Sequence, residues 1–225
     1  MNFLKGFSFY KFFYDDEKRS FKLNDYLIKG LSQLEYPPSD EQITLIEKFY
    51  ELFVHWSFKI NLSTIKEKSE FIIKHVLDSA SALPFFPENP GRILDLGTGG
   101  GFPGIVLKIM NPEWKIDLVD VVLKKINYLK SIVKDLNLDI NVYNASKEKI
   151  PDKYDIVVSR AFGSLEKTYK ESRKYLKEKG RVFSYKGKKS KIIEEAKALK
   201  KFQIKPIELE VPFLDAERHL VIFRI

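Results

Sequence analysis

The amino-acid sequence predicts an α/β fold in which a doubly wound, mostly parallel sheet follows a helical region. Three observations lead to this prediction. Before Pro87 the apolar residues recur at helical spacing, after Gly91 short β-branched runs alternate with helical stretches, and the first of these runs enters a turn that holds four glycines before Pro103. The 225 residues suffice for one medium-sized domain with a helical appendage. We therefore expect a helical region over residues 1–88 and a sheet domain over residues 89–225.

The helical region contains two well-marked helices. After the break at Pro37-Pro38, Ser39 lies three residues before Gln42, the spacing of a capping box at a helix start. Apolar residues then recur at three- and four-residue steps as far as Trp56, which predicts a helix buried along one side. A second helix is predicted over 69–83, and its apolar face comprises Ile72, Val76, Ala80 and Leu83.

The sheet domain reads as strands separated by crossover helices, the order of parallel βαβ units. The five predicted strands are Arg92–Leu96, Lys115–Asp120, Ile140–Asn144, Tyr154–Arg160 and Gly180–Lys186. Helices are predicted near 103–110, 123–136, 165–178 and 189–201. The last two apolar runs, 203–210 and 219–224, have no helix between them. They predict a terminal hairpin with one strand antiparallel to the rest of the sheet.

Composition excludes several classes of protein. No stretch approaches the roughly 18 apolar residues of a membrane span, and the absence of cysteine rules out disulfides, thiolate metal sites and a cysteine nucleophile. We predict no metal site. The first 20 residues carry seven aromatic side chains but lack the features of a signal peptide. We expect a cytoplasmic protein whose N-terminal aromatics pack on its body or, as the alternative, form a surface for RNA or a partner.

The net charge of +8 is distributed unevenly. Residues 1–120 have a net charge of −3, whereas residues 121–225 carry 25 Lys/Arg against 14 Asp/Glu, a net charge of +11. Within 170–205, 14 basic residues accompany four acidic ones. A solvated lysine-rich face and a polyanion-binding surface both produce such an excess, so charge alone leaves the two open.

The glycine-rich turn over 97–104 predicts a site for a nucleotide-like ligand, because glycines let the backbone approach a ligand and point helix N-terminal amides at it. In the frame Gly99, Gly101, Gly104 the turn satisfies the dinucleotide spacing, so the glycines alone do not exclude NAD. Asp95, however, ends the preceding strand, and its carboxylate would repel a pyrophosphate. It suits S-adenosylmethionine, which carries a sulfonium and an ammonium and no phosphate. Asp120, at the end of the next strand, is placed for the ribose hydroxyls of either cofactor.

The run Asp95-Leu96-Gly97-Thr98-Gly99-Gly100-Gly101 resembles the cofactor loop of the Rossmann-like S-adenosylmethionine-dependent methyltransferases. The resemblance implies a seven-stranded sheet whose last strand is antiparallel, in agreement with the predicted hairpin. It also implies that the adenine lies near the end of the third strand, around Ser146, Lys147 and Glu148.

The chemistry that the chain lacks narrows the methyl acceptor. Methylation at carbon-5 of a pyrimidine usually proceeds through a cysteine adduct, and the chain has no cysteine. Methyltransferases of the adenine amino type carry an Asn/Asp-Pro-Pro-aromatic motif after the fourth strand, where this chain has Ser159-Arg160-Ala161-Phe162. A ring nitrogen with a free lone pair, such as nitrogen-7 of guanine, requires only alignment with the methyl group. Arg160 and Lys186, both at strand ends, are candidates for a cation beside oxygen-6 of such a base.

Six stretches, in order along residues 40–225, resemble one family, the bacterial small-subunit (16S) ribosomal RNA guanine-N7 methyltransferases, also called the glucose-inhibited division protein B family. They are Lys59–Ser63, Lys74–Ser79, Gly101–Gly104, Ser159–Ala161, Tyr185–Gly187 and Pro212–Val221. The resemblance implies an RNA partner, either 16S ribosomal RNA or the small ribosomal subunit, and we expect the enzyme to be a monomer without a metal. Residues 1–20 have no clear counterpart in this pattern.

The resemblance also assigns roles to single residues. It implies that Gly97, Phe102, the pair Lys147-Glu148 and Arg160 contact S-adenosylmethionine, in addition to Asp95, Gly99, Gly101 and Asp120 of the loop argument. Arg160, Lys186 and Arg218 are the residues that we expect on the substrate side. His75, Asp78 and Ser79 share a helix face by their spacing, and we expect this patch to brace the cofactor lobe rather than border the RNA.

The predicted reaction is a direct in-line transfer, in which nitrogen-7 of guanine attacks the methyl carbon with no obligatory general base. A stacked target guanine would first have to be extruded from its helix. Two alternatives remain from the sequence alone. A nicotinamide-dependent oxidoreductase would use the same glycine loop, and a non-catalytic RNA-binding or ribosome-assembly factor would use the basic half without the loop.

Overall fold

A computed structural model describes residues 17–60, 62, 63, 65, 67–150, 153–199 and 202–224. The expected packing of the aromatics within residues 1–14 lies outside these ranges. None of the helices in the described ranges is long and apolar enough to cross a membrane.

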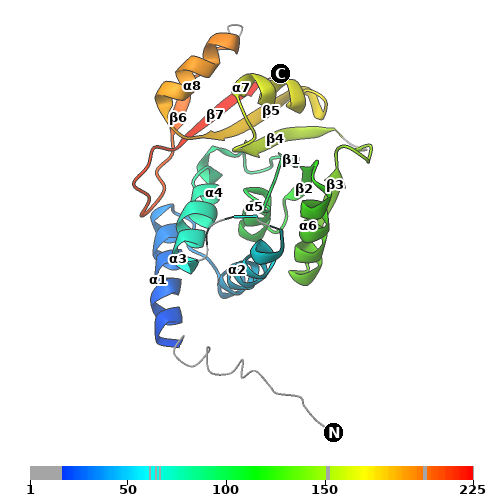
Figure 1. Cartoon of the computed structure of the whole chain (residues 1–225). Coiled ribbons are helices and arrows are strands. Elements are labelled where there is room, and N and C mark those ends of the chain that lie inside the picture. The colour runs from blue at the N-terminus through cyan, green and yellow to red at the C-terminus, as the bar shows by residue number, and fades with distance from the viewer. Residues whose placement is uncertain are drawn as a thin grey trace.

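A seven-stranded sheet forms the centre of the molecule (Figure 1). Its order is β3-β2-β1-β4-β5-β7-β6, and the strands are β1 (Arg92–Leu96), β2 (Lys115–Asp120), β3 (Ile140–Asn144), β4 (Tyr154–Arg160), β5 (Leu176–Lys186), β6 (Pro206–Glu208) and β7 (His219–Arg224). The first five strands are parallel, and β7 runs antiparallel between β5 and β6. This topology confirms the predicted doubly wound sheet with an antiparallel last strand, and it brings the carboxyl ends of β1, β4 and β5 to one edge.

Helices cover both faces of the sheet, and each face has its own apolar core. One face is covered by α1 (Glu17–Gln33), α2 (Asp40–Ile60), α3 (Lys68–Phe71), η2 (Ile72–Leu77), α4 (Asp78–Ala80), η3 (Leu83–Phe85), α5 (Gly104–Met110) and α6 (Leu123–Asp135). The other is covered by α7 (Leu165–Ser172), α8 (Lys189–Ala196) and η4 (Lys197–Leu199). The helices before residue 88 therefore share one core with α5, α6 and the sheet, and a domain boundary at 88/89 stays a prediction.

The capping box predicted at Ser39 is present and also docks α2. The backbone N–H of Ser39 donates to Gln42 Oε1 at 2.9 Å, and the Gln42 N–H donates to Ser39 Oγ at 3.2 Å. Gln42 Nε2 donates in addition to the carbonyls of Ile109 and Met110, which lie at the end of α5. One side chain thus fixes both the start of α2 and its position on the sheet domain.

Four predicted elements differ in the structure. The helix expected over 165–178 ends at Ser172, and β5 begins four residues earlier than predicted, at Leu176, because Leu176 pairs with the buried Tyr154. The helix expected over 69–83 is divided, since residues 72–77 form a π-helix, whose wider turn rotates the residues after it. The strand expected over 203–210 is only three residues long, Pro206–Glu208.

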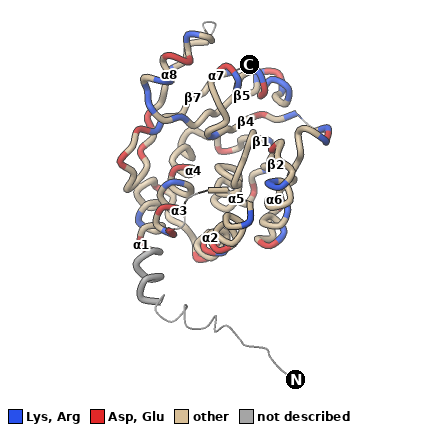
Figure 2. The backbone as a smooth tube through the Cα atoms, viewed as in Figure 1, with Lys and Arg blue, Asp and Glu red and all other residues tan. Residues whose placement is uncertain are grey.

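The charged residues of the C-terminal half are only partly compensated. Figure 2 shows basic and acidic positions interleaved along α7 and α8. Lys170 pairs with Glu166 at 2.7 Å, and Lys174 pairs with Glu171 at 2.6 Å. Lys170 in α7 and Lys174 just after it thus have acidic partners, whereas Lys188 and Lys191 at the start of α8 border the cavity described below.

Candidate active site at the ends of β1, β4 and β5

The glycine loop joins β1 to α5 with a backbone that only glycine adopts without strain. Gly97, Gly99 and Gly101 have φ angles of 71°, 59° and 95°. A Cβ atom at Gly101 would collide with the side chain of Ile105, and one at Gly97 would collide with the ring of Phe162. At Gly99 the nearest atoms to such a Cβ are 3.9 Å and 4.0 Å away, so this part of the loop is open to a ligand.

Asp95 lies beneath this loop and ties its two ends together. Its Oδ2 atom accepts from Thr98 Oγ1 at 2.6 Å and from the Gly104 backbone N–H at 2.8 Å. The side chain is fully buried, and burial raises the pKa of this carboxyl to about 6. The second oxygen, Oδ1, is buried without a hydrogen-bond partner in the described part of the chain. Asp95 thus supports the loop through Oδ2, and its expected role beside a cationic ligand stays a prediction.

Asp120 organises the next part of the edge. One carboxylate oxygen accepts from the Gly99 N–H at 3.1 Å and the other from the Val122 N–H at 2.9 Å. Val121, which lies between Asp120 and Val122 in the sequence, is apolar, yet it is 63% exposed. Sequence reasoning missed Val121, and the available signal was an apolar residue directly after an acidic strand end.

The residues expected to surround the adenine lie beside this point. The Ala145 N–H donates to the Asp120 carbonyl, and Ser146 Oγ donates to the Val121 carbonyl at 3.4 Å. Lys147 and Glu148 follow in an exposed turn, where Glu148 lies 3.7 Å from Lys130. The ends of β2 and β3 therefore meet, as the strand order requires.

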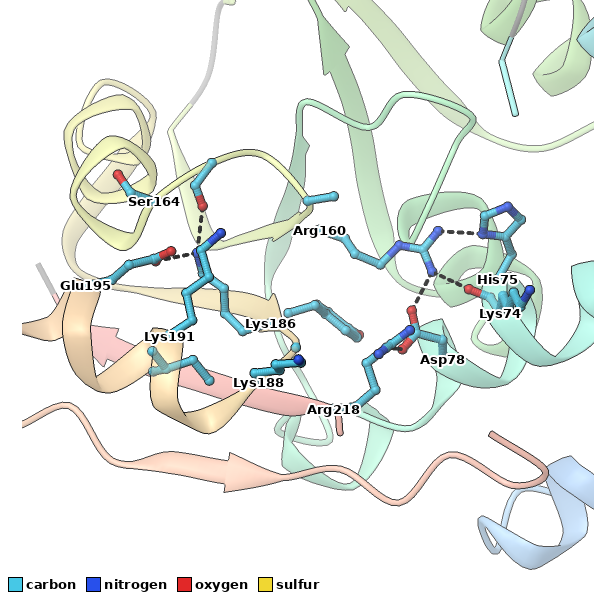
Figure 3. A pocket seen from close by; sticks show the side chains of 15 residues that line it. Lys74, His75, Asp78, Arg160, Ser164, Lys186, Lys188, Lys191, Glu195 and Arg218 are labelled. Carbon is cyan, nitrogen blue, oxygen red and sulfur yellow. Dashed lines mark hydrogen bonds and ion pairs between the residues drawn. The ribbon is translucent and has the colours of Figure 1, made fainter. Parts of the chain in front are cut away.

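Arg160, at the end of β4, is held by three groups from the helical layer (Figure 3). Its Nη1 donates to the Lys74 carbonyl at 3.1 Å and to Asp78 Oδ2 at 2.7 Å, and its Nη2 contacts His75 Nδ1 at 2.9 Å. Its guanidinium also lies over the Phe102 ring, 5.1 Å from the ring centre. These contacts fix the orientation of the guanidinium.

His75 and Phe102 form the apolar support under Arg160. Their rings stack with centres 4.3 Å apart, and Phe102 is buried among aromatic side chains of α2 and α3. Burial, followed by the charge of Arg160, lowers the pKa of His75 to about 3, so the imidazole is neutral at physiological pH. The side chain of Phe102 thus belongs to the core, and only its backbone is available to a ligand at the loop.

Asp78 connects two arginines that are far apart in the sequence. Its Oδ2 accepts from Arg160, and its Oδ1 accepts from Arg218 Nε at 3.0 Å. Ser79, predicted to share this face, is turned into the core, where its hydroxyl donates to the His75 carbonyl and its own carbonyl accepts from Tyr185.

Lys186, at the end of β5, belongs to a second buried pair. Its Nζ donates to the Gly163 carbonyl at 2.6 Å and to Glu195 Oε2 at 2.7 Å. Glu195 was missed by sequence reasoning, because nothing in the run Ile192–Lys197 distinguishes it from a solvated helix residue. Beyond Lys186, the His219 ring is buried and donates from Nδ1 to the Gly187 carbonyl at 2.7 Å.

A cavity of about 830 Å³ lies between the Asp78–Arg160 pair and the Lys186–Glu195 pair. Its polar walls comprise Lys74, His75, Asp78, Arg160, Ser164, Lys186, Lys188, Lys191, Glu195 and Arg218 (Figure 3). The three residues expected on the substrate side, Arg160, Lys186 and Arg218, are thus brought together, next to the loop from which α5 starts. Among the described residues, no group of three His, Cys, Asp or Glu is placed to hold a metal ion.

Comparison with known proteins identifies relatives over most of the chain. A family model described as GidB, rRNA small subunit methyltransferase G, matches residues 42–221. A ribosomal RNA small subunit methyltransferase G of Acinetobacter baumannii is 37% identical over 205 residues, which cover 88% of this chain and 96% of that protein. The protein of the same name from Francisella philomiragia is 32% identical over 203 residues, covering 90% and 98%.

Solved structures share the fold at lower identity. A SAM dependent methyltransferase from Aquifex aeolicus has a TM-score of 0.52 and 18% identity, covering 72% of this chain and 96% of that one. The tRNA (m1A58) methyltransferase TrmI from Aquifex aeolicus has a TM-score of 0.52 and 14% identity, covering 78% and 75%. These structures show the fold, and the family match together with the relatives over nearly their full length shows that the chain belongs to the GidB family of rRNA small subunit methyltransferases G.

Proposed function

We propose that this protein transfers a methyl group from S-adenosylmethionine to nitrogen-7 of a guanine in 16S ribosomal RNA. The observation that carries the proposal is a basic cavity whose Arg160 lies over the Phe102 ring of the glycine loop, in a chain that belongs to this family. Family membership leaves no support for the nicotinamide alternative. We propose in addition that the enzyme acts in the cytoplasm as a monomer.

The loop fits S-adenosylmethionine in its shape and in its free polar atoms. Within the described residues, a Cβ at Gly99 would meet nothing closer than 3.9 Å, and the buried Asp95 Oδ1 has no hydrogen-bond partner. The exposed apolar side chain of Val121 beside Asp120 offers a surface for the adenine ring. We assign contacts with the cofactor to Asp95, Gly97, Gly99, Gly101, the backbone of Phe102, Asp120, Val121, Lys147, Glu148 and Arg160.

The cavity supplies what the proposed acceptor requires. When bound, S-adenosylmethionine supplies a methyl group on a positively charged sulfur, and nitrogen-7 of guanine attacks through a lone pair that carries no proton. No general base is therefore needed, in agreement with a neutral and hydrogen-bonded His75. Arg160 orients the reactants, and Lys186 and Arg218 place the base and its phosphates, so that catalysis comes from proximity and orientation.

The deciding experiment measures methyl transfer from labelled S-adenosylmethionine to small ribosomal subunits and to free 16S ribosomal RNA from a strain that lacks this enzyme. We expect label in 7-methylguanosine after digestion to nucleosides, and the better of the two substrates shows when in assembly the enzyme acts. Label in another nucleoside would overturn the assigned acceptor. An assembly factor without catalysis would bind the subunit and transfer no label.

A further inference from the structure

The pair Lys186–Glu195 lies across the cavity from Arg160 and Asp78 (Figure 3). Its side chains are only 12% and 13% exposed, yet both line the cavity. Glu195 Oε2 accepts from Lys186 Nζ at 2.7 Å and from the Leu165 N–H, the first N–H of α7, at 2.8 Å. These two bonds from different elements hold the carboxylate in one place.

The remaining hydrogen-bonding capacity of the pair faces the cavity. In the described ranges, all the hydrogen bonds of Glu195 engage Oε2, so Oε1 keeps its acceptor capacity. Lys186 Nζ uses two of its three protons, on Gly163 and Glu195. The wall thus presents an ammonium proton next to a carboxylate oxygen.

This order of donor and acceptor matches one nucleobase. The Watson–Crick edge of guanine carries the oxygen-6 acceptor, followed by the N1–H and 2-amino donors. Adenine carries an amino donor and then the bare N1 acceptor, which would set its donor against the ammonium and its lone pair against the carboxylate. We propose that Glu195 selects guanine: its Oε1 accepts from N1–H and the 2-amino group while Lys186 donates to oxygen-6. This inference rests on the proposed function, whose acceptor is a guanine.

The same placement orients the reacting atom. Nitrogen-7 lies on the imidazole side of guanine, away from the N1 and 2-amino positions. With its Watson–Crick edge on Glu195, the base directs nitrogen-7 across the cavity toward Arg160, which stands beside the glycine loop. The Watson–Crick edge is free for this contact only when the base is unpaired, as in an extruded or single-stranded nucleotide.

Inosine provides the test, because it keeps nitrogen-7, oxygen-6 and N1–H of guanine and lacks only the 2-amino group. The substrates are small subunits reconstituted with 16S RNA carrying guanosine or inosine at the methylated position. For the wild type we expect kcat/KM to be about ten- to hundredfold lower with inosine, the loss typical of a hydrogen bond to a charged group. Equal rates with the two nucleosides would overturn the proposal before any variant is made.

Glu195→Gln then assigns the discrimination to this residue. We expect the guanosine-to-inosine ratio of kcat/KM to fall toward one in E195Q, because an amide loses the charged acceptor. A purely structural role would lower both rates by the same factor and leave the ratio unchanged, which would refute the assignment. Glu194→Gln, on the exposed neighbouring position of α8, is the matched control and should keep the wild-type ratio.

The wild-type inosine measurement stands if E195Q does not fold, and Glu195→Asp then serves as the second variant. A shorter side chain withdraws the oxygen from the base and should also lower the ratio. Failure of this inference differs from failure of the proposed function. If only the inference on Glu195 fails, the wild type still forms 7-methylguanosine. If the proposed function fails, the wild type forms none.

Discussion

Substitution of Asp78 by Asn tests whether one carboxylate holds both arginines of the cavity. The side chains of Asp78 and Arg160 are 5% and 14% exposed, and that of Arg218 is 28% exposed, so both ion pairs are largely shielded from water. A charge-assisted hydrogen bond contributes about 1.5–3 kcal/mol. Asn keeps the size of Asp but only one acceptor oxygen, and it presents an amide donor to the second arginine.

We therefore expect Asp78→Asn to lower the free energy of unfolding by about 2 kcal/mol, which corresponds to a Tm lower by about 4–8 °C in a chain of this size. The same displacement of a guanidinium from the reacting centre should lower kcat/KM for methyl transfer by about ten- to hundredfold. The assay is transfer of labelled methyl groups to the small subunit, with thermal unfolding measured on the same samples.

A double-mutant cycle separates positioning from general destabilisation. If Asp78 acts through Arg218 as well as Arg160, Asp78→Asn should cost less activity in an Arg218→Ala background than in the wild type, with the part that acts through Arg160 retained. Glu70→Gln is the control, because Glu70 forms an exposed pair with Lys74 on the same helical segment and should change neither rate nor Tm. Wild-type kcat/KM in the Asp78 variant, or additive effects of the two substitutions, would refute this reasoning.

Three further predictions concern the loop, the RNA and pH. Gly99→Asp should abolish binding of S-adenosylmethionine in a titration, because its charge faces Asp120. It should also lower the free energy of unfolding by about 1–2 kcal/mol, because an L-residue is strained at a φ of 59° even though its Cβ has space; retained binding would contradict the proposed cofactor site. Lys188 and Lys191 border the cavity, so their double alanine variant should raise KM for RNA and leave kcat unchanged. It should also reduce the slope of log affinity against log salt concentration by about 1.4, because each lost phosphate contact with a single strand reduces this slope by about 0.7. Lys170→Ala/Lys174→Ala, in which both lysines already have acidic partners, should leave that slope unchanged. The pKa of His75 is about 3 in the folded state and 6.5 in the unfolded state, so the unfolded chain binds the extra proton between these pH values. The contribution of His75 therefore lowers the free energy of unfolding as pH falls from about 6.5 to 3, by up to about 1.4 kcal/mol per pH unit. The pKa of Asp95 is raised to about 6, so Asp95 raises the free energy of unfolding as pH falls from about 6 to 4. The difference in unfolding free energy between the wild type and His75→Gln isolates the contribution of His75. A difference that does not change with pH would contradict this prediction.

The first four strands have the predicted limits, because their β-branched runs are short and are separated by helical stretches. Two of them also have a local signal at the end, since β1 lies between Gly91 and Gly97 and β2 ends at Asp120. The helix expected over 165–178 was too long because Tyr175 and Leu176 also satisfy helical spacing, and only the pairing of Leu176 with Tyr154 makes this position a strand. Tertiary pairing of this kind has no local signature.

The residues of the site were predicted by type, and their partners were not. Arg160, Lys186 and Arg218 line one cavity and their role toward the substrate stays a prediction, but the carboxylate of Asp78 that two of them share is 140 residues from Arg218. Glu195 resembles its exposed neighbour Glu194 in the sequence, and only the position of α8 over the end of β5 gives it a buried partner. The burial of Asp95 and its two hydrogen bonds within the loop likewise had no signal in the sequence.

The position of Asp78 on the helical layer makes the two parts of the chain interdependent in function. Arg160 and Arg218 extend from strand ends of the sheet domain, and their counter-ion comes from the helices that precede it. A sheet domain that folded before those helices docked would already carry the glycine loop, yet its two guanidinium groups would be free to attach to any phosphate. The contact between the helical layer and the sheet thus fixes the two guanidinium groups in place, so that activity on RNA depends on both parts of the chain.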